Sequence, residues 1–140
     1  MTSVTTHSIV QNKRSSVQTN AKTMVKLYQY TVDLVYDKSN LFITWNCPFT
    51  GNNGSEHRNL VNLVYNEEPI TRSAKYNKEA WSLAPFTIKG VAEGEKGTQK
   101  IDIEVEVDGG IFMAPFIDLT KIEAANGLDV VLTVLEVESS

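Results

Sequence analysis

The sequence predicts a mainly β protein, an antiparallel β-sandwich or barrel of six to seven strands with one short helix and a flexible N-terminal arm. Several stretches alternate apolar and polar residues, and clusters of Gly, Asn, Asp and Ser separate them. Only one short segment has a helical period. A chain of 140 residues, 41% hydrophobic and 21% charged, is long enough to bury a core, so we expect a single β domain over residues 23–140.

The N-terminal third is expected to hold the arm and a hairpin. Residues 1–22 are rich in Thr, Ser, Gln and Asn and have few large apolar side chains, which is typical of a flexible arm. Residues 24–36 alternate and are rich in β-branched and aromatic residues, which favours a strand. The turn cluster DKSN at 37–40 and the apolar segment at 41–47 then predict the return strand of a β-hairpin.

The middle of the chain predicts two shorter strands between polar connections. Residues 48–59 are polar and contain two glycines, so we expect a loop. Residues 60–66 are apolar and predict a short strand. Pro69 excludes a central strand position around it, because proline cannot donate to the ladder. Residues 82–91 predict a strand, and the two glycines within 92–99 predict a turn.

Residues 100–107 form the clearest predicted strand. Their side chains alternate strictly, so one face is apolar and the other is acidic and solvated. The apolar set is Ile101, Ile103, Val105 and Val107, and the acid ladder is Asp102, Glu104, Glu106 and Asp108. Residues 111–126 change to a roughly helical period that Pro115 interrupts, which predicts the short helix. Residues 128–138 predict a last, buried strand.

Charge is distributed unevenly, although the net charge is only −4. Residues 1–26 contain no acid, whereas residues 101–140 contain nine acids and a single base. The basic residues of the first part are Lys13, Arg14, Lys22 and Lys26. A basic arm can pair with the acid ladder of a neighbouring copy, so these two sets are the candidate assembly interface. The alternative is that both sets are ordinary solvated surfaces, which need no partner.

No group of residues has the spacing of a catalytic or metal site. His7 and His57 lack a second His or Cys at ligand spacing, which argues against zinc. Cys47, the only cysteine, is expected to be a small buried residue. Because phosphate-binding, transmembrane, secretory and basic-aromatic signatures are missing from the sequence, we expect no enzyme, cofactor, specific nucleic acid or membrane.

Trp45 and Trp81 leave one rival function open. Tryptophans on β domains can stack on sugar rings, so a carbohydrate-binding accessory module is the alternative to an assembly role. Packing in a core or an interface is the commoner use of a tryptophan, because its side chain buries a large apolar area.

Three segments resemble the minor tail protein L family of long-tailed bacteriophages. The first is VKLYQYTVDL, which is similar to the opening strand of that family. The second is YNKEAWSLAPFTIKGVAEGEKGTQKIDIEVEV, with an aromatic residue, a Pro-aromatic pair, a glycine-rich turn and an alternating strand. The third is GGIFMAPFIDLTKIEAANGLDVVLTVLEV, which is similar to the helix and closing strand that follow. The resemblance covers residues 24–137.

This resemblance implies a structural protein of the virion tail, made in the cytoplasm of the host bacterium. It implies a homo-oligomeric ring (a trimer, hexamer or dodecamer) at the tail tip, baseplate or collar. The expected neighbours are tail-tube, hub, tape-measure or side-fibre proteins. Longer members of the family continue into a cysteine-rich region that has no counterpart in these 140 residues, so no metal cluster is carried over.

Overall fold

The computed structural model describes residues 2–11, 15–18, 24–52, 57–77, 84–107, 111–114 and 130–139. Within these ranges every element is a β-strand, and all strand pairs are antiparallel, which confirms the predicted mainly β fold. The strands are β1 (Val4–Gln11), β2 (Ser15–Gln18), β3 (Val25–Asn52), β4 (His57–Tyr65), β5 (Glu68–Asn77), β6 (Ala84–Val107), β7 (Ile111–Ala114) and β8 (Val130–Glu138).

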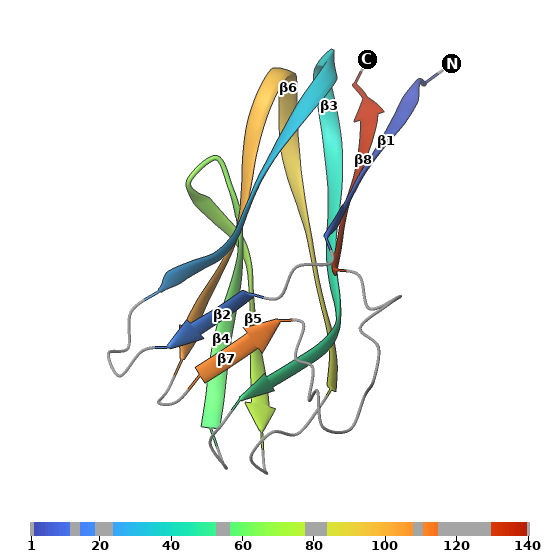
Figure 1. The fold of residues 1–140 in the computed structure, drawn as a ribbon. Coiled ribbons are helices and arrows are strands. Elements are labelled where there is room, and N and C mark those ends of the chain that lie inside the picture. The colour runs from blue at the N-terminus through green and yellow to red at the C-terminus, as the bar shows by residue number, and fades with distance from the viewer. Residues whose placement is uncertain are drawn as a thin grey trace.

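Two long strands organise the molecule. β3 and β6 pair from Val25 opposite Val105 to Thr50 opposite Ala84, and both bend at the same level. The pairing register shifts in β3 between Leu34 and Lys38, which lies opposite the stretch of β6 that contains Gly97. Figure 1 shows this two-stranded ribbon turning over at the top of the molecule.

The shared bend overturns two sequence predictions. A hairpin over 24–47 is wrong, because its two halves, residues 25–34 and 38–47, each pair with β6 and not with each other. A turn over 92–99 is wrong for the same reason, since that segment lies inside β6. Turn residues in these segments let the paired strands β3 and β6 fold over together, which local sequence patterns do not distinguish from a hairpin whose two arms pair with each other.

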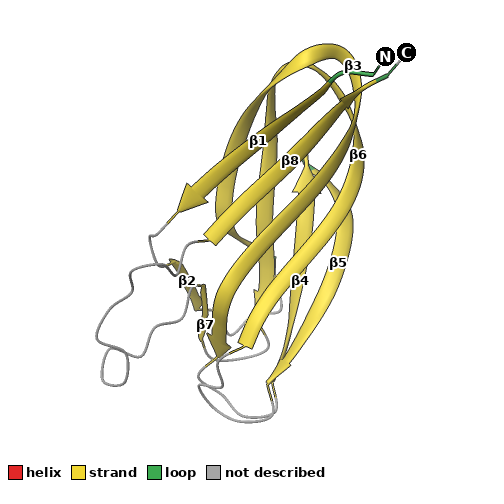
Figure 2. Cartoon of the chain, turned by 90° about the vertical axis from the view of Figure 1, so that its right-hand side faces the viewer, coloured by secondary structure: helices red, strands yellow, loops and turns green. Residues whose placement is uncertain are grey.

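The bend stacks two layers of a β-sandwich. The six strands of the main path follow the order β1-β8-β3-β6-β4-β5. β8 pairs with β3 beyond the bend, at residues 39–46, so β1, β8, this half of β3 and the paired half of β6 form one layer. β4 pairs with β6 at residues 101–107, so the other halves form the second layer with β4 and β5 (Figures 1 and 2).

The core fills the space between these layers. Trp45 is fully buried, and its Nε1 donates a hydrogen bond to the hydroxyl of Tyr30 at 3.0 Å. Its ring contacts Tyr28 and Phe86. Cys47 is also fully buried, as predicted. Alternate residues of β3, β4, β6 and β8 supply the remaining core, including Leu41, Ile43, Val61, Leu63, Ile88, Ile101, Ile103, Val105, Val130, Leu132 and Val134.

The ends of the chain differ from expectation. A flexible arm over 1–22 is wrong for residues 4–11 and 15–18, which form β1 and β2. The segment is polar, but an edge strand needs only a small buried face. Ile9 supplies part of that face by packing against the core. The predicted helix lies mostly outside the described residues, and its first residues, 111–114, form β7.

The other predicted elements agree with the structure. The predicted strands at 60–66, 82–91, 100–107 and 128–138 lie mainly within β4, β6 and β8. Pro69 is in β5, which ends the strand path, so its exclusion from a central position is confirmed. The loop predicted at 48–59 is wrong at residues 48–52, which belong to β3, and at 57–59, which belong to β4; the rest lies outside the described residues.

Gly94 allows the close approach of β3 and β6 just below the bend. A Cβ atom at this position would lie 2.5 Å from Ser39 Oγ and 2.8 Å from Leu34 Cδ1. We therefore expect Gly94→Ala to lower the free energy of unfolding by about 1–3 kcal/mol through overpacking. Urea denaturation measures this change, with Lys96→Ala, at an exposed neighbouring residue, as the control. Adding Ser39→Ala should recover part of the loss. Equal stability of Gly94→Ala and the wild type would contradict this packing.

Candidate assembly surface

β1 is the outermost strand of the first layer. It pairs with β8 along its whole length, from Val4 opposite Val137 to Gln11 opposite Val130. The main strand path ends at β1, and no described residue pairs with its other side. Figure 2 shows β1 at the margin of the layer, next to β8. As far as the described residues extend, the backbone on this side of β1 is therefore open to an additional strand.

Four residues of β1 direct their backbone groups toward the open edge. Glu138 N donates to Ser3 O at 2.9 Å, so these directly opposite residues form a hydrogen-bonded pair. Hydrogen-bonded and non-hydrogen-bonded pairs alternate along an antiparallel ladder. The outward N–H and C=O groups consequently belong to Val4, Thr6, Ser8 and Val10, all of which are exposed.

The open edge of β1 lacks the features that usually prevent strands from pairing. β1 reads VTTHSIVQ, with no Lys, Arg, Asp, Glu or Pro. β5, at the other end of the path, reads EPITRSAKYN and contains Pro69, Arg72 and Lys75. Charged residues and proline on an edge strand oppose pairing with another chain. β5 is thus a protected edge and β1 is not.

An apolar row on the outer face of the first layer continues this edge. Thr6 is opposite Leu135, Leu135 is opposite Phe42, and Phe42 is opposite Val91. Phe42 is 49% exposed and Val91 66% exposed, although the residues beside Phe42 in sequence are buried. The edge and this face together form a continuous surface with little charge. We call β1 and this row the assembly surface.

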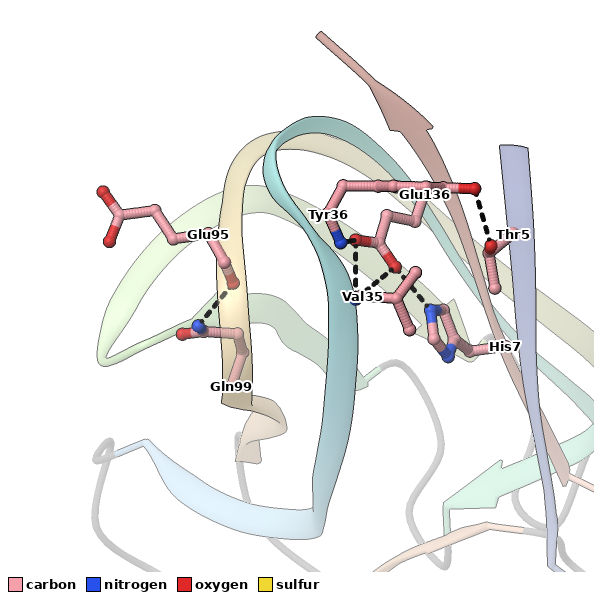
Figure 3. A network of polar contacts seen from close by, with 7 residues as sticks. All are labelled: Thr5, His7, Val35, Tyr36, Glu95, Gln99 and Glu136. Atoms are coloured by element: carbon pink, nitrogen blue, oxygen red, sulfur yellow. Dashed lines mark hydrogen bonds and ion pairs between the residues drawn. The ribbon is translucent and has the colours of Figure 1, made fainter. Parts of the chain in front are cut away.

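A buried carboxylate holds β1 in place. Glu136 of β8 is fully buried and accepts hydrogen bonds from the backbone N–H groups of Val35 and Tyr36, at 3.0 and 2.9 Å. It also contacts Nε2 of His7 on β1 at 2.8 Å. The hydroxyls of Thr5 and Tyr36 are 2.8 Å apart. Figure 3 shows these contacts joining β1, β8 and the bend of β3.

The surroundings of Glu136 favour its ionised form. Burial alone would raise the pKa of this carboxyl group. The hydrogen bonds from Tyr36, His7 and Val35 outweigh burial, so the pKa lies below its ordinary value of 4.5. A charged carboxylate with three donors is thus an internal support for the edge strand.

The structure pairs part of the predicted interface within one chain. Lys26 Nζ lies 3.4 Å from Asp102 Oδ2 and 3.7 Å from Glu67 Oε1. The hydrogen bond with Asp102, then the charges of Asp102 and Glu67, raise the pKa of Lys26. Asp102 is only 3% exposed, so the prediction of a solvated acid ladder is wrong at this residue.

Of the remaining predicted interface residues, Glu104 lies directly opposite Lys26 in the β3–β6 ladder, and its charge adds to the raised pKa of Lys26. Glu104 and Glu106 are half-buried on β6. Lys13, Arg14, Lys22 and Asp108 lie outside the described residues. The hypothesis that a basic arm meets the acid ladder of a neighbour therefore loses Lys26 and Asp102, which already pair with each other.

Trp45 cannot stack on a sugar, because its side chain is buried in the core. The prediction that Trp45 binds carbohydrate is wrong, and Trp81 lies outside the described residues.

Sequence reasoning also missed β1 as a surface. The β-branched residues of VTTHSIV favour a strand, but the polar residues around them led to the prediction of a flexible arm.

The described residues contain no cluster of three or more His, Cys, Asp or Glu side chains that could hold a metal ion. Among the same residues, no helix is long and apolar enough to cross a membrane.

Comparisons with known proteins give weak structural likenesses. No family model and no curated protein matches the chain. A solved sugar-binding protein, the EclA C-terminal domain, is 13% identical, with a TM-score of 0.46 over 80% of this chain and 76% of that one. The VP2 subviral particle of infectious bursal disease virus is 13% identical, with a TM-score of 0.42 over 98% of this chain and 38% of that one.

A third likeness is the carbohydrate-binding module CBM36, solved with calcium and xylotriose. It is 13% identical, with a TM-score of 0.35 over 88% of this chain and 78% of that one. All three TM-scores are low, so the functions in these names stay with those proteins.

The contacts of Glu136 predict a specific dependence of stability on pH. Because its folded pKa is below 4.5, its contribution is complete above that value and is lost as the pH falls through the folded pKa. Glu136→Gln should lower the free energy of unfolding at pH 7 by about 1.5–3 kcal/mol, the usual effect of a hydrogen bond to a charged group.

The experiment is denaturant unfolding between neutral and acidic pH. The stability difference between the wild type and Glu136→Gln should shrink as the pH falls below 4.5. Glu138→Gln, on the same strand but exposed, is the matched control and should follow the wild type. A difference that stays constant over this pH range would show that the charge of Glu136 is not involved.

Proposed function

We propose that this protein is a non-catalytic structural subunit that assembles with copies of itself through β1. The observation that carries the proposal is the uncharged open edge of Val4–Gln11, with an exposed apolar row beside it. A strand of this kind pairs readily with another strand, because its free N–H and C=O groups then complete a ladder. A second copy supplies the same unprotected edge.

The sequence of β1 is complementary to itself in one antiparallel register. If two copies pair around His7, Val4 faces Val10 of the partner and Thr6 faces Ser8. The first pair is apolar and the second can exchange a hydrogen bond between hydroxyls, and both kinds of cross-strand pair are stabilising. In this register the outward backbone groups of one copy meet those of the other.

The finer proposal is that the assembly belongs to a bacteriophage tail, as a ring at the tail tip, baseplate or collar. The resemblance of residues 24–137 to the minor tail protein L family supports it. A two-fold contact through β1 joins copies in pairs, so hexamers or dodecamers would need a second kind of contact. Tail-tube, hub, tape-measure or side-fibre proteins would then bind surfaces other than the paired edge.

A lysine in the middle of the edge tests the assembly. Thr6→Lys places a positive charge opposite Ser8 of the partner strand and diagonal to its own copy, and we expect it to convert dimers or larger assemblies into monomers. The mass of the protein is measured by light scattering over a range of concentrations. Circular dichroism should show that the β fold is retained, because Thr6 is exposed.

Thr98→Lys is the matched control. Thr98 is an exposed strand residue opposite Asp33 in the second layer, so the same substitution adds the same charge away from β1. This variant should keep the wild-type mass. A wild-type protein that is monomeric at every concentration, or a Thr6→Lys variant with the wild-type mass, would overturn the proposal.

A further inference from the structure

The first layer presents a face that consists of three cross-strand rows. Alternate residues of a strand lie on one face, and residues opposite each other in the ladders form rows across β1, β8, β3 and β6. The central row is Thr6, Leu135, Phe42 and Val91. The row on one side of it is Val4, Val137, Asn40 and Glu93. The row on the other side is Ser8, Thr133, Thr44 and Lys89. We call these three rows the outer face.

The middle of the outer face is apolar and accessible. Phe42 is 49% exposed and Val91 66% exposed. A hollow in this part of the face is lined by both side chains, with Asn40 and Glu93 beside them. An exposed apolar patch with polar residues around it is typical of a surface that binds another molecule.

Lys89 and Glu93 are the only charged residues of the outer face. Both are exposed on β6, and they lie on either side of Val91. Four residues of an extended strand separate them by about 13 Å, so they do not pair within one chain. Among the described residues neither side chain forms an ion pair. The face therefore carries one positive and one negative charge, placed symmetrically about its central row.

This symmetry makes the outer face complementary to itself. Two sheets pack face to face about 10 Å apart, with their strands aligned to within about 30°. If a two-fold axis runs along the central row, the strands of the two copies are antiparallel. Lys89 of each copy then lies over Glu93 of the other, and Phe42 packs beside Phe42 of the second copy. Asn40 lies over Thr44 of the second copy, where an amide and a hydroxyl can form a hydrogen bond.

The opposite arrangement lacks this complementarity. With a two-fold axis along the strands, β6 lies over β1 of the second copy. Lys89 then covers Ser8, and Glu93 covers Val4. Both charges would lose water without gaining an opposite charge, which is unfavourable. The positions of the two charges therefore favour the antiparallel stack.

We propose that the outer face packs on the outer face of a second copy, with antiparallel strands and Lys89 of each copy paired with Glu93 of the other. This inference rests on the proposed self-assembly, but it uses a face where that proposal uses an edge. It supplies a second kind of contact, so assemblies can grow beyond pairs of copies joined through β1.

The size of the outer face predicts a weak contact. Four strands about 4.8 Å apart and a few residues of about 3.3 Å along each give an area on the order of 400 Å² for each copy. Two copies then bury less than the roughly 1,200 Å² of a standard interface. Stacking should accordingly depend on protein concentration up to about 1 mM.

The experiment is reversal of each charge, followed by the mass of the full chain in sedimentation and light scattering over this concentration range. Lys89→Glu places two glutamates over each other, and Glu93→Lys does the same with two lysines. Each variant should weaken stacking about tenfold or more, because like charges oppose each other across the contact. An equimolar mixture of the two variants should stack again, since each then meets the opposite charge. The double variant should also stack like the wild type.

Lys96→Glu is the matched control, because it reverses an exposed charge of β6 outside the outer face. It should keep the wild-type mass. Lys89→Glu with the wild-type mass would overturn the stack, as would a mixture that assembles no further than its two separate components. Recovery in the mixture cannot come from a change in the fold of one variant, so it identifies a contact between copies.

The two proposals fail in different ways. Thr6 lies on the edge strand and in the central row, so Thr6→Lys acts on both contacts, whereas Lys89→Glu acts on the face alone. Dimers that Thr6→Lys separates and Lys89→Glu leaves intact would overturn the stack only. Monomers of Lys89→Glu that reassemble in the mixture would support the stack and overturn pairing through β1. A wild type that is monomeric at every concentration would overturn both.

Discussion

Val35 and Tyr36 lie where β3 bends, and their backbone N–H groups have no partner on β6 there, because the register shifts between Leu34 and Lys38. The carboxylate of Glu136 accepts both of these hydrogen bonds from inside the sandwich. Buried backbone donors must be satisfied, so this single side chain makes the bend possible. The bend in turn stacks the two layers and encloses the core around Trp45.

The same interaction connects the bend to the edge of the molecule. Glu136 contacts His7, so the strand that carries the open edge is anchored to the strand pair that forms the sandwich. Next to the bend, Gly94 of β6 lies opposite Ser39 of β3, and the two strands approach too closely there for a larger side chain at residue 94. One local departure from a regular ladder therefore connects the bend to the position of the open edge.

Charge has a different role in the folded chain from the one that its distribution along the sequence indicates. Asp102 and Glu136 are acidic residues of the C-terminal part, and both are buried with partners from distant segments. What remains near β1 is a surface with little charge, so contact between copies would depend on backbone pairing and apolar area. Such contacts are less sensitive to salt than pairs of exposed charges.

The sequence by itself determined the class of fold and several strands, because alternation with period two is a local property that a segment such as 100–107 carries alone. It also placed Cys47 in the core and excluded Pro69 from a central strand. Only the tertiary structure decided that 38–40 and 93–95 pair with each other across β3 and β6, instead of each closing a hairpin of its own. His7 and Glu136 lie 129 residues apart, so their contact, and the ordered edge that depends on it, exist only after the layers have stacked.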